Sequence, residues 1–590
     1  MAELLQPIQF APGFDKRTTS YAAEGRWVDG DKVRSVGGIV ETMGGWDRLV
    51  QDTTFEGKCR GLLAWRDNDN VKRVAIGTHR RLYLLSAETV TNITPLRASG
   101  SLTGPFTTAA GSPVVTVAHT NHGLDSGTYA IFSGAAAVGG ITIDGEYVVT
   151  VVDGNSYTIT HSSNAGAAAT GGGTVGYQYE INVGQADNTD AFGFGVGKYG
   201  EGTYGTVRST SVLLRCRTWS LDTLGENLIA CPRGGDIYEW DPDTAGRAAI
   251  IANAPAGNLG IFVTNELHIV ALAAGGDKMR VAWCDPNDNT VWTAAAANQA
   301  GAKRLKGGSE ILAGGPLRAG VYVIQTDSDT FRMSFVAQEP FFTFFSEGEG
   351  SGIVGPNAMT SLDGIAYWMG NGNFYFYDGF VRELPQQDDI RDFVFEGAAD
   401  GLDTGQLDKV FCFTSTLFRE IWWLYQSAAA ASGEVDRYVL FNLDEGVWYT
   451  GTMARTAWID KRIFAFPYAA ADDGYIYQHE SGEDDRTDAL RKFITSAPVD
   501  LGDGARHMEV LGILPDFDDQ AGDVTLTVMT RDHPQGAETS SAYTLATGTD
   551  RLDLREGGRQ VAMTFESDTA GGKFRFGRHR LAIQPTGRRR

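Results

Sequence analysis

The sequence lacks a cysteine framework. Its five cysteines are widely spaced and include no CxxC pair: Cys59, Cys216, Cys231, Cys284 and Cys412. Paired CxxC motifs are typical of zinc ribbons, and an even cysteine set in a short secreted chain is typical of a disulfide scaffold. Neither class fits, so we expect reduced thiols in a protein that folds in a cytoplasm.

Long apolar runs are also absent. No stretch of 18 or more apolar residues occurs, and residues 1–17 (MAELLQPIQFAPGFDKR) hold no basic segment followed by an apolar one. A membrane-spanning helix or a secretory signal needs such a run. We therefore expect a soluble chain that is not secreted through a cleaved signal and that makes no stable membrane insertion.

Positive charge is in short supply. The chain has 50 Lys and Arg against 73 Asp and Glu, a formal net charge of −23 at pH 7. Proteins that grip nucleic acid do so through basic surfaces that contact phosphates. The charge therefore argues against a sequence-reading DNA binder, whereas DNA as a passing cargo stays open.

Glycine, in contrast, is abundant. The 590 residues include 74 glycines but only 18 prolines, and the glycines follow no Gly-X-Y period. This distribution is typical of many tight turns between short strands. Together with a globular content of hydrophobic residues, it predicts an all-β protein of several domains.

A strand–turn–strand phrase recurs along the chain. Examples are RVAIGTHRRLYLLS (73–86), LIACPRGGDIYEWDP (228–242) and IAYWMGNGNFYFYDG (365–379). Six comparable positions follow one another at about 40 to 50 residues, except for one interval of 64 between the fourth and the fifth: Tyr238, Ala282, Arg332, Tyr375, Val439 and Ile476. Several strands in each such period predict a β-propeller of six to seven blades.

The remaining segments divide the chain further. We predict N-terminal strands or a platform in 1–60, a first blade in 61–100 and the other blades in 184–484. Residues 101–183 are rich in Ala, Gly, Thr and Ser and have short β runs, so they are expected to form a small inserted β-barrel domain. Residues 485–590 alternate as a C-terminal β-sandwich or platform domain. Strands within 13–49 could either close the propeller or build the platform.

Motifs for chemistry are weak throughout. His119 and His122 form an HxxH pair without the Glu or a third ligand that a zinc site needs. Cys231 has no nearby His to activate it, and the Gly-rich text at 193–200 has no following helix for a nucleotide fold. Carboxylates at blade turns could bind Ca²⁺, although turn geometry alone explains them: Asp236, Glu239, Asp241 and Asp285. We predict no catalytic residue, no metal and no cofactor.

Four phrases carry a resemblance to a known family. They are GFDKRTTSYAAEGRWVDGDKVRSVGGIVETMGGWDRL (13–49), GFGVGKYGEGTYG (193–205), WSLDTLGENLIACPRGGDIYEWD (219–241) and KFRFGRHRLAIQPTGRRR (573–590). In these, the chain resembles the tail-tube or nozzle proteins, also called DNA-stabilisation proteins, of short-tailed bacteriophages. The insert is similar to small barrels found as additions in phage structural proteins.

The resemblance implies a virion-tail protein that is not an enzyme. Six copies would form a ring around the DNA channel, below a tail adaptor bound to the portal, and would hold tail fibres outside. The ring would retain the packaged genome and pass double-stranded DNA without sequence specificity. Two alternatives stay open: a propeller enzyme acting on surface glycan, which would need two converging carboxylates or a His/Tyr pair, and a host-adhesion module based on the insert.

Two sets of residues are candidates for contact. The glycine-aromatic loop 191–207 is a candidate gate, lumen or interface segment because glycine permits movement: Phe194, Lys198, Tyr199 and Tyr204. Residues 347–352 (EGEGSG) are a second candidate gate. The basic run Lys303, Arg304 and Lys306 is a candidate contact to DNA phosphates or to a neighbouring subunit.

Overall fold

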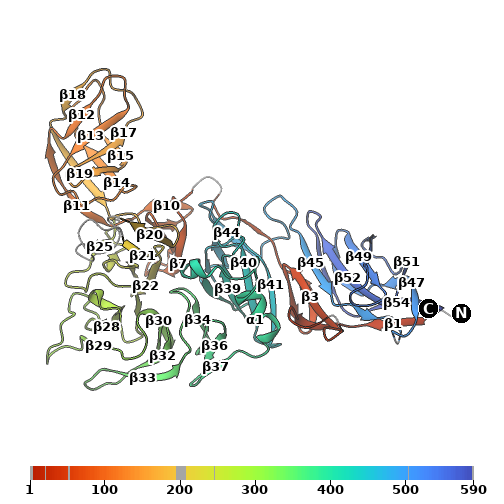
Figure 1. Cartoon of the computed structure of the whole chain (residues 1–590). Coiled ribbons are helices and arrows are strands. Elements are labelled where there is room, and N and C mark those ends of the chain that lie inside the picture. Colours follow the sequence, from red (N-terminus) through yellow and green to blue (C-terminus); the bar gives the residue numbers. More distant parts are fainter. Residues whose placement is uncertain are drawn as a thin grey trace. The chain divides into compact units, whose positions relative to one another are not determined.

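The computed structural model describes residues 4–19, 21–50, 54–193, 208–244, 246–502 and 504–587. Within these ranges the chain is almost entirely β, and α1 (Asp388–Phe395) is the single α-helix (Figure 1). No helix of the described residues is long and apolar enough to cross a membrane. The chain divides into two compact units, unit 1 (Met1–Asp52, Leu317–Ser334, Thr343–Arg590) and unit 2 (Thr53–Pro316, Phe335–Phe342).

Seven four-stranded sheets of the described residues have the form of propeller blades. Unit 2 holds three of them, each made of four consecutive strands. Their strands are β7 (Cys59–Arg66), β8 (Lys72–Thr78), β9 (Leu82–Ser86) and β10 (Thr89–Asn92); β22 (Trp219–Leu224), β23 (Asn227–Pro232), β24 (Tyr238–Trp240) and β25 (Ala249–Ile250); and β26 (Gly260–Val263), β27 (Ile269–Leu272), β28 (Arg280–Trp283) and β29 (Gly301–Arg304).

The chain passes between the units within the next sheet, and three more sheets belong to unit 1. The strands are β30 (Ile311–Arg318), β31 (Val321–Thr326), β32 (Asp329–Phe335) and β33 (Phe342–Glu349); β34 (Met359–Leu362), β35 (Ile365–Met369), β36 (Phe374–Tyr377) and β37 (Val381–Glu383); β38 (Phe411–Ser415), β39 (Glu420–Tyr425), β40 (Arg437–Asn442) and β41 (Val447–Thr452); and β42 (Ala457–Ile459), β43 (Tyr468–Ala470), β44 (Ile476–His479) and β6 (Trp46–Arg48).

The sheets of each unit pack as blades do. In unit 2 the first strands lie side by side, β7 against β22 and β22 against β26, and in unit 1 β34 lies against β38 and β38 against β42. Contact between the first strands of successive sheets is the radial repetition of a propeller. The predicted all-β class and its six to seven blades are confirmed.

The sequence period follows the third strands of six of the seven blades. All six positions chosen for spacing lie there, in β24, β28, β32, β36, β40 and β44. The long interval of 64 residues is explained by α1 and the 3-10 helix Thr404–Lys409, which stand between β37 and β38. The period is therefore set by one repeated strand, and its irregularity comes from an extra connection.

Burial in these strands is less regular than a two-residue alternation. In β36 Phe374 and Tyr377 are buried while the two aromatics between them are half-buried, and all six residues of β39 are buried. A blade strand with neighbours on both faces has no solvent side, so apolar residues run continuously. Phe374, for example, packs against Trp423 and Trp448, with ring centroids 4.8 Å apart in both pairs.

The insert of unit 2 consists of two sheets with a core of their own, which includes Phe106, Phe132 and Val175. Its strands run from Leu96 to Glu180, and the prediction placed it at 101–183 (Figure 1). One sheet has the order β11 (Leu96–Thr103), β19 (Thr174–Glu180), β14 (Tyr129–Ser133), β15 (Gly145–Val148); the other has β16 (Thr150–Asp153), β17 (Ser156–Thr160), β13 (Val114–Ala118), β12 (Phe106–Thr108), β18 (Ala169–Gly171).

The N-terminal region of unit 1 contributes strands both to the last blade and to the platform sheets. Strand β6 pairs with β44 and completes the last blade, while the five strands before it join the C-terminal sheets, as β3 beside β45 in Figure 1 illustrates. The two alternatives for residues 13–49 therefore both occur. The platform sheets contain β1 (Leu4–Ile8), β54 (His579–Gly587), β47 (His507–Leu514) and β51 (Leu552–Gly558); β2 (Ala11–Phe14), β3 (Arg26–Asp31), β45 (Lys492–Ser496), β46 (Val499–Asp500), β49 (Val524–Arg531), β50 (Thr539–Leu545) and β52 (Gln560–Ser567); and β4 (Val33–Val36), β5 (Ile39–Thr42), β53 (Lys573–Phe576) and β48 (Phe517–Ala521).

Candidate functional site

The candidate gate residues Phe194, Lys198, Tyr199 and Tyr204 lie outside the described residues. The strands on either side of them, β20 (Thr189–Gly193) and β21 (Arg208–Leu214), pair as an antiparallel ribbon. The second candidate gate, 347–352, is partly a regular strand, because β33 continues to Glu349. Ser351 is buried there, and its hydroxyl lies 2.8 Å from that of Thr330. That part of the chain is not a free loop.

The candidate basic run lies at the edge of a blade. Lys303 and Arg304 end β29, the outer strand of its sheet, and Lys306 follows; all three are exposed. The guanidinium Nε of Arg304 donates to Asp277 Oδ2 at 3.0 Å. The pKa of Asp277 is lowered, first by the backbone N–H of Met279 and also by Arg304. One of the three cations is thus paired, and the run remains a predicted contact.

Cys231 has none of the properties of a reactive thiol. It is fully buried on β23, and burial raises the pKa of its thiol. A thiolate is the reactive form, so this shift makes Cys231 inert. The turn between β23 and β24 begins at Arg233, since Pro232 still belongs to β23, and the two strands pair antiparallel with Ala230 opposite Tyr238.

His119, His122 and Glu239, which resembled metal ligands, have separate partners. Nδ1 of His119 lies 2.8 Å from the Tyr179 hydroxyl, and Nε2 of His122 lies 2.7 Å from the carbonyl oxygen of Asp153. Glu239 accepts hydrogen bonds from the side-chain amides of Asn227 and Asn289, both at 2.9 Å. In the described ranges no group of three or more His, Cys, Asp or Glu is placed to hold a metal ion.

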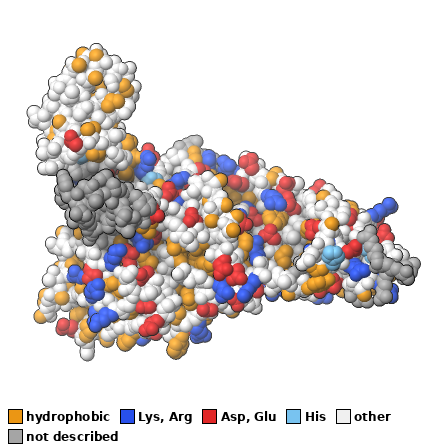
Figure 2. Space-filling view, in the orientation of Figure 1, with side chains coloured by type: hydrophobic (Ala, Val, Ile, Leu, Met, Phe, Trp, Pro, Cys, Tyr) orange, Lys and Arg blue, Asp and Glu red, His pale blue; other side chains and the backbone are white. Residues whose placement is uncertain are grey.

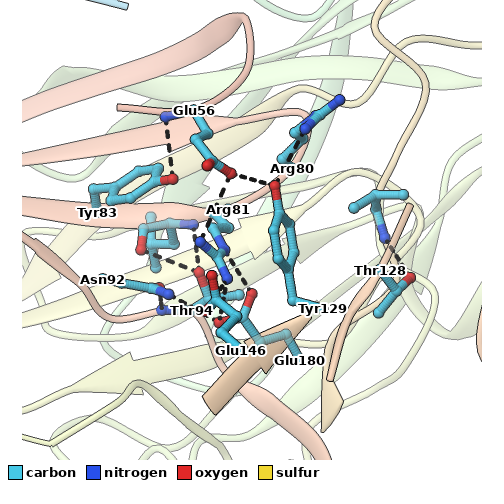
Figure 3. Close-up of polar contacts among 12 residues, drawn as sticks. Glu56, Arg80, Arg81, Tyr83, Asn92, Thr94, Thr128, Tyr129, Glu146 and Glu180 are labelled. Atoms are coloured by element: carbon cyan, nitrogen blue, oxygen red, sulfur yellow. Dashed lines mark hydrogen bonds and ion pairs between the residues drawn. The ribbon is translucent and has the colours of Figure 1, made fainter. Parts of the chain in front are cut away.

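The most developed polar cluster joins the insert to the first blade, and sequence reasoning missed it (Figure 3). Arg81, at the start of β9, donates through Nε to Oε2 of Glu180 at 2.8 Å and also pairs with Glu146. Glu180 ends β19 and is fully buried, and its other oxygen accepts from Asn92 Nδ2 and Arg247 Nη1, both at 2.8 Å. We call this set the insert joint.

Tyrosine and a third carboxylate extend the insert joint. The guanidinium of Arg81 lies over the ring of Tyr129 at 3.4 Å, and the Tyr129 hydroxyl donates to Glu56. Burial alone would lower the pKa of the Arg81 guanidinium, but Glu146 and Glu180 outweigh it and raise the pKa. Because each buried charge is compensated, the cluster holds a domain in place and leaves no free acid or base.

A second cluster ties the N-terminal region to the blades within unit 1. Arg34 of β4 is 2% exposed; its Nη2 donates to Glu480 Oε1 at 2.7 Å and its Nε lies 3.3 Å from Oε1 of Glu420. The other oxygen of Glu420 accepts from Trp422 Nε1 at 2.9 Å. We call this set the N-terminal joint.

A polar groove of about 390 Å³ lies beside the N-terminal joint. Four carboxylates line it, and each has a cation within 4 Å: Glu41 with Arg575, Glu480 with Arg34, Glu483 with Lys492, and Asp519 with Lys573. Glycoside hydrolysis needs one protonated and one ionised carboxyl group facing the substrate. Three of these carboxylates accept a hydrogen bond from their cation, which is typical of a structural network. Glu41 lies 3.6 Å from Arg575, and burial raises the pKa of its carboxyl group.

Comparison with known proteins gives distant structural likenesses. No family model matches the chain, and no curated protein matches it. Among solved structures it is similar to "Phage phi92 endosialidase" at 11% identity and TM-score 0.19, covering 72% of this chain and 64% of that one. It is also similar to "YCF48 bound to D1 peptide" at 8% identity and TM-score 0.30, covering 66% and 97%. The chain thus spans less than two thirds of the endosialidase length, and likenesses this distant carry no argument about activity or partners.

Proposed function

We propose that this chain is a structural, non-enzymatic component of the tail of a short-tailed bacteriophage. In this proposal six copies form a ring, the nozzle, that continues the DNA channel below the tail adaptor. The ring retains the packaged genome and passes it during ejection, and its outer surface holds tail fibres. The protein is folded in the host cytoplasm and ends in the virion tail.

One observation carries the proposal: the first and the last described strands pair with each other in one sheet. β1 pairs with β54 over five residues, from Leu4 opposite Ile583 to Ile8 opposite His579. β54 is an inner strand with β47 on its other side, and β6 completes the last blade. Chain ends are where local unfolding usually starts. A protein that must bear the pressure of packaged DNA is better served by ends that are tied into its sheets.

The buried polar groups support a scaffold as well. The insert joint and the N-terminal joint each hold a nearly or fully buried arginine between carboxylates, which fixes the elements they join in one geometry. Losing either partner of such a pair leaves an uncompensated buried charge. A propeller enzyme of the alternative class would instead need two carboxylates or a His/Tyr pair that converge on a propeller face.

The negative net charge of the chain suits the wall of a channel that DNA passes through. Six copies would carry six times the formal charge of −23. A channel with an acidic wall repels phosphates, so DNA would slide without adhering. Lys303 and Lys306, exposed at a blade edge, are the described residues that we propose for contact with DNA or with a neighbouring copy.

Native mass spectrometry tests the assembly. The full chain is measured alone and after incubation with tail-adaptor rings isolated from particles, with bovine serum albumin as a non-assembling control. The proposal predicts a complex that contains six copies of this chain per adaptor ring. A chain that stays monomeric with adaptor rings present contradicts it.

A further inference from the structure

The insert carries a groove that neither the insert joint nor the proposed nozzle explains. It has a volume of about 720 Å³ and lies where β15, β16 and the end of β17 meet. Small-molecule sites typically enclose about 300–1,000 Å³ and combine aromatic rings with a few placed polar groups. Besides Glu146, which also belongs to the insert joint, its lining includes Asp144, Tyr147, Thr150, Thr160, His161 and Ser162.

Aromatic rings lead from the core of the insert to this groove. Phe132 is buried; its ring centroid lies 6.2 Å from that of Tyr147, whose ring stacks in turn on His161 at 6.2 Å with an interplanar angle of 28°. Tyr147 and His161 are half-buried. The core therefore fixes the positions of two rings that line the groove.

The polar groups of the groove are held in place but retain free capacity. Asp144 Oδ1 accepts from the backbone N–H of Ala135 at 2.9 Å, which leaves its second oxygen for a ligand. Nδ1 of His161 is engaged by the backbone of Ser163, whose N–H lies at 3.0 Å and carbonyl oxygen at 3.1 Å, so Nε2 is the nitrogen left over. Exposed hydroxyls of Thr150, Thr160 and Ser162 complete the lining.

The charge of the insert restricts what can bind there. From Leu96 to Glu180 the chain contains five carboxylates, no lysine and a single arginine, Arg97. That arginine is engaged by the carbonyl oxygens of His122 and Gly123. On the face of the insert that Figure 2 shows, side chains are mostly hydrophobic or uncharged. Phosphates, nucleic acid, anionic lipid and acidic sugars all require cations, which this domain does not supply.

We propose that the groove binds an uncharged oligosaccharide. A pyranose ring presents a flat face of C–H groups, which packs on aromatic rings, and a rim of hydroxyls, which donate to carboxylates and exchange hydrogen bonds with hydroxyls and imidazole. The groove offers those partners together: the Tyr147 and His161 rings, the free oxygen of Asp144 and three hydroxyl groups. This binding is independent of the proposed nozzle assembly, since every residue involved lies in the insert.

Sugar binding would also affect the insert joint, through Glu146. Glu146 lines the groove and pairs with Arg81 of the first blade. A sugar hydroxyl that donates to Glu146 would compete with Arg81 for it. Occupation of the groove would then loosen the insert joint on its Glu146 side and leave the buried Arg81–Glu180 pair intact.

Saturation-transfer NMR on the full chain tests the proposal. The probes are maltotriose, N-acetylglucosamine trimer, mannotriose and galactotriose, with a sialic acid trimer and oligolysine as charged comparisons. We expect saturable binding of at least one neutral probe, with affinity reduced at least tenfold by Asp144→Asn and by His161→Ala. The matched control Thr107→Ala, at an exposed position outside the groove, should leave the affinity unchanged.

Three results would overturn the proposal: no neutral probe binds at millimolar concentration, only oligolysine or sialic acid binds, or neutral binding survives both groove substitutions. Circular dichroism of each variant verifies that the insert remains folded. If His161→Ala does not fold, Asp144→Asn decides alone, because an Asn side chain keeps the oxygen that Ala135 contacts. A chain that fails to assemble into rings but binds the sugar would contradict the nozzle and leave the groove proposal standing.

Discussion

Trp46 lies opposite His479 across the antiparallel pair of β6 and β44, and the centroids of the two rings are 5.0 Å apart. Trp458 lies on His479 as well, at 4.5 Å, and Arg455 donates through Nε to Nε2 of the imidazole at 2.9 Å. The N-terminal region is thus attached to the last blade by an aromatic cluster in addition to its backbone hydrogen bonds.

Removing the Trp46 ring should destabilise unit 1. Trp46 is 6% exposed, and large-to-small substitution of a buried aromatic costs about 3–5 kcal/mol. We expect Trp46→Ala to lower the free energy of unfolding by about that amount in a urea titration followed by circular dichroism. Phe380→Ala, whose ring is 72% exposed, is the control and should stay within about 0.5 kcal/mol of wild type. Equal losses in both variants would contradict the account.

Stability should fall on acidification below neutral pH. Burial lowers the pKa of His579 to about 4, and burial together with Arg455 lowers the pKa of His479 well below 6.5. Between pH 6.5 and the folded pKa the unfolded chain binds protons that the folded chain does not, so stability is complete above pH 6.5 and is lost as pH falls. For His579 a shift to about 4 corresponds to roughly 3 kcal/mol.

Thermal melts from pH 7.5 to 4.5 measure this slope. The variant His579→Leu removes a buried imidazole whose nitrogens have no hydrogen-bond partner among the described residues. It should melt with a shallower pH dependence than wild type. An unchanged slope would show that His579 is already protonated in the folded chain or exposed to solvent.

The insert joint should behave as a coupled charge pair. Arg81→Met leaves Glu180 buried with less compensation, which costs about 3–5 kcal/mol for a buried pair. The double variant Arg81→Met, Glu180→Gln should recover part of that loss, giving a coupling free energy above about 1 kcal/mol in a double-mutant cycle. Additive losses would mean that Arg81 and Glu180 do not interact in solution. An exposed pair, Arg551 with Asp553, serves as the comparison and should show little coupling.

Removal of the insert should leave the blades folded. Leu96 and Glu180 are opposite each other in the β11–β19 pair, so the two ends of the insert are neighbours and a short Gly/Ser linker can replace 97–179. We expect circular dichroism and melting of the remaining chain to stay cooperative. In a phage that carries the deletion, complete particles that do not infect would indicate adhesion by the insert. Particles that fail to assemble would assign the insert a structural role.

The blades could be predicted from the sequence because each is local. A strand–turn–strand phrase repeats at intervals of about 40 to 50 residues. The six positions chosen for spacing all lie on the third strand of a blade. Contacts between residues that are far apart in the sequence produce no such repeat. Arg81 and Glu180 are 99 residues apart and Arg34 and Glu480 are 446 apart, so nothing in their neighbourhoods reveals the pairing.

The site residues were harder to predict for a different reason. Cys231 stood out because of its chemistry, but it belongs to the apolar strand β23, and its burial there makes it inert. The aromatic pair joins Tyr147 of β15 to His161, which follows β17, and these two strands lie in different sheets. A signal for the insert joint existed in one respect: Arg81 directly precedes the apolar strand β9, and a charge that is buried with such a strand needs a partner.

Cryo-electron microscopy of labelled particles tests the central claim most directly. A small tag inserted at Asn371, an exposed residue of the turn between β35 and β36, is bound by a labelled antibody fragment, and the virion tail is imaged. The account predicts extra density in six positions around the distal end of a short tail. Label on the capsid shell, or intact particles from which the chain is missing, would contradict it.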